Sequence, residues 1–144
     1  MTLEQIRKEL DIHFIRIDAI LPELTSYLPL KESDFQEIEK IKTIDFFIYR
    51  FTKIQDRMGE KLFPLILKEL HEYKTSMSLI DVLHRLEKLE LLESSDIWID
   101  YRKLRNALTH EYPDNEDEMI ESIALAIDVY GDLKKIYTKL LNSV

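Results

Sequence analysis

The chain has 144 residues, of which 45% are hydrophobic, and its formal net charge is -8. This length and apolar content fit one folded domain over residues 1–144 and exclude a disordered chain. The absence of cysteine excludes disulfides, zinc–thiolate sites and cysteine nucleophiles. The negative charge argues against a fold-wide electrostatic grip on nucleic acid, so any such contact has to use a local basic patch.

The N-terminal stretch "MTLEQIRKEL" is charged and amphipathic, and it lacks the apolar core of a signal peptide. No run of the sequence approaches the roughly 20 apolar residues needed to cross a bilayer. We therefore expect a soluble cytoplasmic protein that does not contact membranes.

The composition predicts an all-α protein, because helix-forming Leu, Lys and Glu are abundant and only two glycines and four prolines occur. Helical periodicity extends along almost the whole chain. A first helix is expected over about residues 3–21, where "LPELTSYLPL" interrupts the pattern with two prolines. The apolar face of this helix consists of Leu3, Ile6, Leu10, Phe14, Ile17 and Leu21.

A long second helix is expected to begin at Ser33, with Gln36 three residues later completing a capping box. Gly59 or Pro64 is expected to kink or end this helix, and helical structure continues over residues 60–73. The apolar stripe of the second helix is wide enough to serve both a core and a dimer contact, and the same holds for the last helix.

Three further boundaries can be placed in the second half of the chain. Ser78 and Ser95 each precede a periodic apolar run, as N-cap residues do. Pro113 is expected to end the helix that begins at Ser95, and Asn115 is expected to cap a last helix that extends to about Leu141. The predicted fold is an up-and-down antiparallel bundle of four to six helices.

The segment "RNALTHEYP", residues 105–113, carries the main candidate site. On an ideal helix with about 100° per residue, Arg105 and Tyr112 share a face, whereas His110 lies roughly 140° from Arg105. One straight helix therefore does not aim the arginine and the histidine at one point. They converge if the last turn loosens before Pro113, or if two copies of this helix end face each other across a two-fold axis.

These residue types suit cleavage of a phosphodiester without a metal. Histidine titrates near neutral pH and can transfer protons, so His110 is the candidate acid–base group. Arginine binds phosphate oxygens through its planar fork, so Arg105 is the candidate for stabilising charge at phosphorus, with Asn106 assisting. The basic residues Arg102 and Lys103 are candidates for binding RNA or phosphate. No metal site and no cofactor is expected.

A purely structural interpretation of the same segment stays open. A histidine and basic side chains are ordinary features of a helix C-terminus, where they complement the helix dipole. His13 and His71 lie in similar but incomplete patterns and are interpreted as helix-surface or boundary residues. We assign three aromatic residues to the core rather than to base stacking: Trp98, Tyr101 and Phe63.

The segment "RNALTHEY" resembles the Arg-x4-His-x-Tyr signature of HEPN domains, specifically of the HepT-like group. Arg105, Asn106, His110 and Tyr112 match it position by position, and the helical layout resembles that family over the whole chain. The resemblance implies a helical bundle that forms a homodimer, in which two motif copies build one cleft. It also implies a metal-independent ribonuclease acting as a toxin.

The HepT-like group is usually paired with a minimal nucleotidyltransferase antitoxin, which attaches AMP to the motif tyrosine, here Tyr112. Related proteins have been described as non-catalytic substrate-binding subunits of such a nucleotidyltransferase. Three hypotheses therefore remain: a ribonuclease toxin, a binding or scaffold subunit, and a helical interaction domain with an accidental motif. The acidic residues Glu111, Asp114, Glu116, Asp117 and Glu118 surround the motif, where they complement the dipole of the last helix or repel RNA.

Overall fold

The computed structural model describes residues 1–109 and 116–144, and every regular element in these two ranges is helical. The six α-helices are α1 (Leu3–Ser26), α2 (Ile38–Arg57), α3 (Phe63–Glu69), α4 (Leu79–Lys88), α5 (Ser95–Thr109) and α6 (Glu116–Asn142). A 3-10 helix, η1 (Glu32–Gln36), precedes α2, and a π turn, η2 (Met58–Leu62), joins α2 to α3. The all-α prediction is confirmed.

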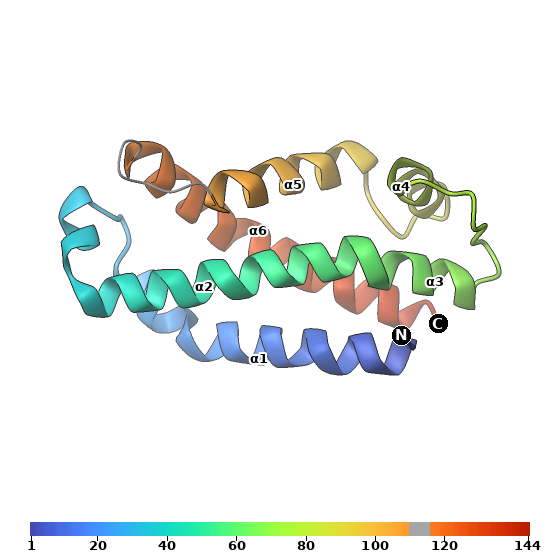
Figure 1. The fold of residues 1–144 in the computed structure, drawn as a ribbon, viewed down its shortest axis with the longest axis horizontal. Helices are drawn as coiled ribbons and strands as arrows, with labels where there is room; N and C mark the ends of the chain where they lie inside the picture. The colour runs from blue at the N-terminus through green and yellow to red at the C-terminus, as the bar shows by residue number, and fades with distance from the viewer. Residues whose placement is uncertain (110–115) are drawn as a thin grey trace.

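The bundle consists of α1, α2 continued by α3, α5 and α6, which alternate in direction along the chain (Figure 1). The short α4 is seen end-on in this view and crosses the same end of the bundle at which the two termini lie. Among the described residues, no helix combines the length and apolar character needed to span a membrane.

The first helix is longer than its sequence predicts. It begins with a capping box in which the Gln5 amide N–H donates to Thr2 Oγ1 (3.2 Å) and the Thr2 N–H donates to Gln5 Oε1 (2.8 Å). The end expected near residue 21 is wrong, because α1 passes through Pro22 and ends at Ser26. Proline removes one backbone donor from a helix. The following turn nevertheless buries Leu24 completely, and this packing favours continuation.

The expected N-cap at Ser33 is also wrong. Asp34 is the capping side chain, since its carboxylate accepts the Lys31 amide N–H at 2.8 Å and Lys40 Nζ at 2.7 Å. These bonds stabilise η1 instead of an α-helical turn, and α2 begins only at Ile38. The hydrogen bonds from Lys40 and from the Lys31 amide hold the pKa of this carboxylate below its usual value, against the opposite effect of its burial.

The kink expected at Gly59 takes the form of the π turn η2. Helical structure continues through Pro64, which lies in the first turn of α3, where its missing N–H costs little. The helix ends at Glu69 rather than at residue 73. The chain then turns at His71, which has a left-handed backbone (φ 58°), and this agrees with its interpretation as a boundary residue.

The later boundaries agree more closely with the predictions. Ser78 caps α4 through its Oγ, which accepts the Asp81 N–H at 3.3 Å, as predicted. Helix α5 begins at Ser95 as predicted, but the hydroxyl that accepts its first amide groups belongs to Ser94. The last helix ends at Asn142, close to the predicted Leu141. Pro113 and Asn115 lie outside the described residues.

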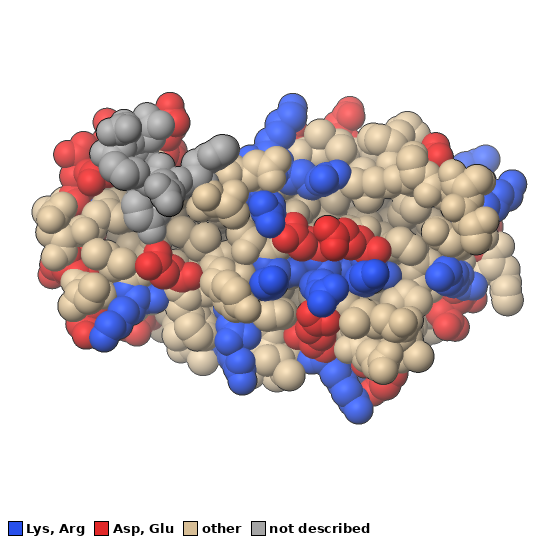
Figure 2. Space-filling view, in the orientation of Figure 1, with Lys and Arg blue, Asp and Glu red and all other residues tan. Residues whose placement is uncertain are grey.

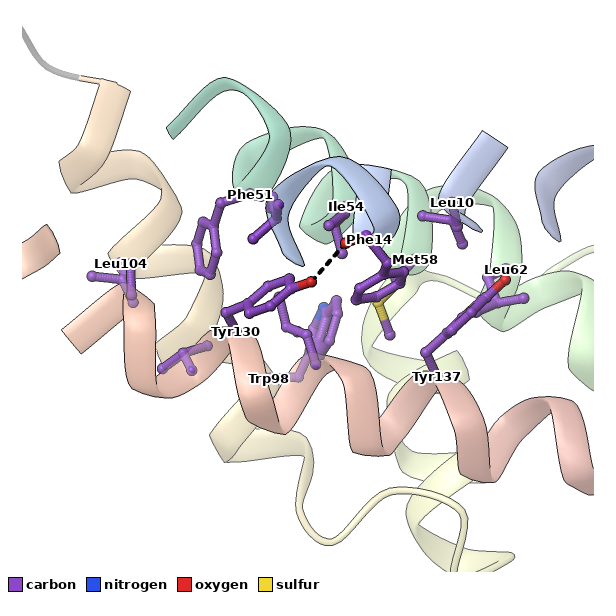
Figure 3. Packing of buried hydrophobic residues seen from close by; sticks show 14 of the residues in the cluster. Leu10, Phe14, Phe51, Ile54, Met58, Leu62, Trp98, Leu104, Tyr130 and Tyr137 are labelled. Atoms are coloured by element: carbon purple, nitrogen blue, oxygen red, sulfur yellow. Dashed lines mark hydrogen bonds between the residues drawn. The ribbon is translucent and has the colours of Figure 1, made fainter. Parts of the chain in front are cut away.

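The core joins all the long helices through aliphatic and aromatic side chains. Two tyrosines of α6 bind it to α1. The Tyr130 hydroxyl donates to the Phe14 carbonyl at 3.0 Å (Figure 3) and contacts Asp18 at 2.7 Å. The Tyr137 hydroxyl contacts Asp11 at 2.7 Å. Burial raises the pKa of both phenols, so they remain neutral donors. Trp98 and Phe63 are fully buried, as predicted for core residues.

His13 corrects a sequence-based interpretation, because it is buried (8% exposed) rather than a surface residue. Its Nδ1 lies 3.1 Å from Nη1 of Arg50. A guanidinium can only donate, so Nδ1 accepts and the imidazole is neutral. Burial and the Arg50 charge lower the His13 pKa, with smaller contributions from Lys53 and Arg16 in the same direction and from Glu9 in the opposite one.

We expect the free energy of unfolding to fall as the pH drops below 6.5, the usual histidine value, because the unfolded chain then binds a proton that folded His13 resists. The stability from this site is present above 6.5 and is lost as the pH falls through the lowered folded pKa. Urea unfolding between pH 7 and pH 5 measures this dependence. His13→Gln should weaken this pH dependence of the free energy of unfolding, whereas His84→Gln, which replaces an exposed histidine, should leave it unchanged. The same pH dependence in the wild type and both variants would contradict the lowered pKa of His13.

Candidate functional site

The candidate site lies on the C-terminal half of α5. Leu104 and Leu108 are buried on the core side of this helix and fix its rotation. Tyr101 fastens the preceding turn, since its hydroxyl contacts Asp132 of α6 at 3.2 Å, and burial raises its pKa to about 12. This rotation places Arg105 at the boundary between core and surface, with 30% of its side chain exposed.

Arg105 is held by a carboxylate from a distant part of the chain. Its Nε donates to Oδ1 of Asp56 at 2.9 Å and its Nη2 donates to Oδ2 at 2.8 Å, so the pair is bidentate. Asp56 lies in the last turn of α2 and is also 30% exposed. A paired fork of this kind fixes the plane and direction of the guanidinium, which a single contact would not do.

The ion pair leaves Arg105 able to bind an anion. A guanidinium has five N–H donors, and Asp56 engages two of them. The remaining donors and the half-exposed position suit one phosphate oxygen approaching from solvent. The carboxylate therefore orients the arginine and also offsets part of its charge.

Asp56 was not among the residues predicted from the sequence. It lies 49 residues before Arg105, and no local motif connects the two. Helical periodicity places Asp56 beside the apolar stripe of α2, but it does not predict which basic side chain pairs with it. Only the packing of α2 against α5 brings these side chains together.

The other predicted residues on α5 are exposed. Arg102, Lys103 and Asn106 are all accessible, and none of their side chains has a hydrogen-bond or ion-pair partner among the described residues. Arg102 lies one turn before Arg105, on the same face. Free basic side chains in this position are available to phosphate. The structure thus places Arg105, Arg102, Lys103 and Asn106 on one helix end.

His110 and Tyr112 lie outside the described residues, so their proposed roles continue to rest on the sequence. Within residues 1–109 and 116–144, no group of three or more His, Asp or Glu side chains is arranged to hold a metal ion.

Charge on this face is mixed rather than uniformly basic. Figure 2 shows a band of acidic side chains between basic ones over the middle of the molecule, where α2 and α5 lie. A separate acidic cluster lies where η1 approaches the start of α6, and it consists of Glu32, Glu116 and Asp117. Repulsion by Asp117 and Glu116 raises the pKa of Glu32. RNA near the motif would therefore meet both attractive and repulsive charges.

Comparison of the chain with protein-family models, with curated proteins and with solved structures finds no match. The observations that bear on function are therefore the motif, the bundle and the local geometry around Arg105.

Proposed function

We propose that the protein is a metal-independent endoribonuclease toxin of the HEPN type. Arg105 binds and stabilises the scissile phosphate, His110 transfers protons, and Asn106 assists with a polar contact. Arg102 and Lys103 bind neighbouring phosphates. The observation that carries the proposal is the bidentate Asp56–Arg105 pair, which holds the motif arginine in a fixed direction at the protein surface.

The proposal includes a homodimer in which two motif copies form one cleft. On a single straight helix the arginine and the histidine do not point at the same place. In a dimer, the second copy supplies another arginine and another histidine to the same cleft. Large apolar side chains exposed on the outside of the bundle offer contact area for a second copy: Ile12, Ile15, Ile38, Tyr49 and Leu125. Tyr49 and Ile38 belong to α2 and Leu125 to α6, the two helices expected to serve both core and dimer.

The proposal also includes a partner. A minimal nucleotidyltransferase antitoxin would neutralise the toxin by transferring AMP to Tyr112, which adds a bulky anion beside the phosphate-binding arginine. RNA would then be excluded by both charge and volume. The support for this step is the match of the motif tyrosine in the sequence.

A second candidate function is a non-catalytic binding or scaffold subunit of the same kind of nucleotidyltransferase. The acidic cluster of Glu32, Glu116 and Asp117 favours it, because the cluster would repel RNA and attract a basic protein surface. In this case Arg105 would hold a nucleotide phosphate without turnover.

Cleavage of labelled RNA in excess EDTA separates the two functions. We expect cleavage by the wild type and by His84→Ala, a control that removes an exposed histidine of α4, and none by His110→Ala. Circular dichroism should show equal helical content in all three proteins. Cleavage that stops on adding EDTA, or that persists in His110→Ala, would contradict the mechanism. A wild type free of any adduct on Tyr112 that cuts no RNA would favour the binding subunit.

A further inference from the structure

Arg50 of α2 is a half-buried arginine that lacks a carboxylate partner. Three other arginines are half-buried, and each forms an ion pair of 2.7 to 2.9 Å: Arg57, Arg85 and Arg105. Among the described residues, no carboxylate pairs with Arg50. Charges withdrawn from water are normally paired. This exception therefore points to an anion from outside the chain.

The groups that hold the Arg50 guanidinium in place are all uncharged. Its Nη1 lies 3.1 Å from Nδ1 of the neutral His13. Its Cζ lies 5.1 Å from the centre of the Phe46 ring and 5.6 Å from the centre of the Tyr49 ring. Nε is covered by protein, whereas Nη2, which also has no partner within residues 1–109 and 116–144, is not covered. The contacts thus fix the guanidinium without neutralising it and leave Nη2 to donate to an anion.

Two more cations lie beside Arg50, and we call the three together the basic patch: Arg16, Arg50 and Lys53. Lys53 is one turn further along α2, and Arg16 belongs to the neighbouring α1. Both are exposed, and neither has an ion-pair partner in the part of the chain that the structure describes. Besides burial, the charges of all three lower the pKa of His13, so they surround the same imidazole. The carboxylate nearest in effect, Glu9, is already bound by another arginine at 2.7 Å.

The basic patch lies next to the candidate phosphate site. Lys53 is three residues after Arg50 and three residues before Asp56, the carboxylate that holds Arg105. With a rise of 1.5 Å per residue, Arg50 and Asp56 are about 9 Å apart along the axis of α2. Figure 2 shows basic side chains on both sides of the acidic band, over α5 and over α2. A strand that is held at Arg105 and crosses this band therefore reaches the basic patch.

We propose that the basic patch binds the phosphate backbone of a single-stranded RNA, beyond the phosphate that is cleaved. The guanidinium of Arg50 suits phosphate oxygens, and the net charge of -8 leaves RNA binding to such local patches. Tyr49, beside Arg50, is 54% exposed. An exposed aromatic ring among cations is the combination that binds single-stranded nucleic acid, because every base has a flat face to stack on. This ring favours RNA over an acidic polypeptide. The inference rests on the proposed ribonuclease function for the identity of the ligand.

The salt dependence of RNA binding tests the proposal. The probe is a labelled oligouridylate, and its binding to His110→Ala, which should not cut it, is followed by fluorescence anisotropy in EDTA at several salt concentrations. Each phosphate contact with a single strand contributes about 0.7 to the slope of log affinity against log salt. Adding Arg16→Gln and Lys53→Gln should therefore reduce the slope by about 1.4 and weaken binding roughly tenfold at 0.1 M salt. An oligoadenylate should show the same change, because the contacts are to phosphate.

Arg50 is tested separately, since it is half-buried. Arg50→Met keeps an unbranched stem against the two rings and should reduce the slope by about 0.7. The matched control is Lys135→Gln with Lys139→Gln, which removes two exposed lysines of α6 that have no ion pair within the described ranges. This control should keep the slope. Circular dichroism should show equal helical content in all these proteins.

Tyr49 is tested by a second pair of variants. Tyr49→Leu should weaken RNA binding at least fivefold, whereas Tyr49→Phe, which keeps the ring, should bind as the parent does. Because Tyr49 is also exposed to contact by a second copy, sedimentation velocity is run on both variants. We expect the same assembly in both, so that the loss of binding reflects the ring and not the oligomer.

Equal slopes in the patch variants and the control would overturn the inference. So would polyglutamate that displaces the RNA as well as unlabelled RNA of the same charge does, since the patch would then fit an acidic protein. Cleavage of RNA in EDTA by the wild type keeps the two proposals apart. Cleavage with unchanged slopes in the patch variants defeats this inference alone. Reduced slopes in the patch variants, with no cleavage by a wild type free of any adduct, defeat the ribonuclease alone.

Discussion

Replacing Arg105 with lysine is expected to lower the rate of RNA cleavage by about 10²- to 10³-fold, the usual effect of removing one charge-stabilising donor. Lysine keeps the positive charge, but it loses the planar fork that Asp56 now holds through two bonds of 2.9 and 2.8 Å. The measurement is single-turnover cleavage of a labelled RNA in EDTA at saturating protein.

Arg85→Lys is a matched control. Arg85 of α4 also pairs with a carboxylate, Glu72, at 2.9 Å and is 34% exposed, but it lies outside the motif. We expect its substitution to leave cleavage within about twofold of wild type, since a half-exposed ion pair of this kind contributes little to stability. Equal losses in both variants would mean that the arginine acts through the fold and not at the phosphate.

Asp56→Asn extends the same experiment to the residue that orients Arg105. The amide keeps the shape of the side chain but removes the charge-assisted bonds, each worth more than a neutral one. We expect cleavage to fall by about tenfold, the change that corresponds to 1.4 kcal/mol in the barrier. A rise in activity would show instead that the carboxylate competes with the phosphate.

Phe47→Ala is expected to cause the largest loss of stability, about 3–5 kcal/mol, because truncating a buried phenylalanine leaves a cavity. Phe47 is fully buried in α2, with ring centroids 5.6 Å from Phe51 and 6.3 Å from Tyr130. Such a loss is a large share of the roughly 5–15 kcal/mol by which a domain is stable. Urea unfolding followed by circular dichroism measures it.

Ile15→Ala is the control for this prediction, since Ile15 lies on the outer face of α1 and is 66% exposed. Its substitution should change the free energy of unfolding by no more than about 0.5 kcal/mol. A loss below about 1 kcal/mol in Phe47→Ala would contradict the placement of this ring at the centre of the bundle. A large loss in Ile15→Ala would indicate that the exposed face is covered by a second copy.

The sequence by itself predicted the fold class, because helical periodicity and scarce Gly and Pro are local properties that a helix needs. It also located the cap at Ser78, where the capping residue and its partner are three residues apart. It placed the ends of the first and second helices incorrectly. At Pro22 and at Ser33, burial of Leu24 and capping by Asp34 outweighed the local signals.

For the candidate site, the sequence singled out one segment, from Arg102 to Tyr112, as the proposed place of the chemistry, because the spacing of a motif is a local property. It did not predict Asp56. This residue belongs to α2 and meets Arg105 of α5 only after both helices bury their apolar faces against the same core. Composition and spacing therefore determined that the chain is helical and which segment carries the motif. Packing between segments about 50 residues apart decided that Asp56 is the carboxylate that orients Arg105.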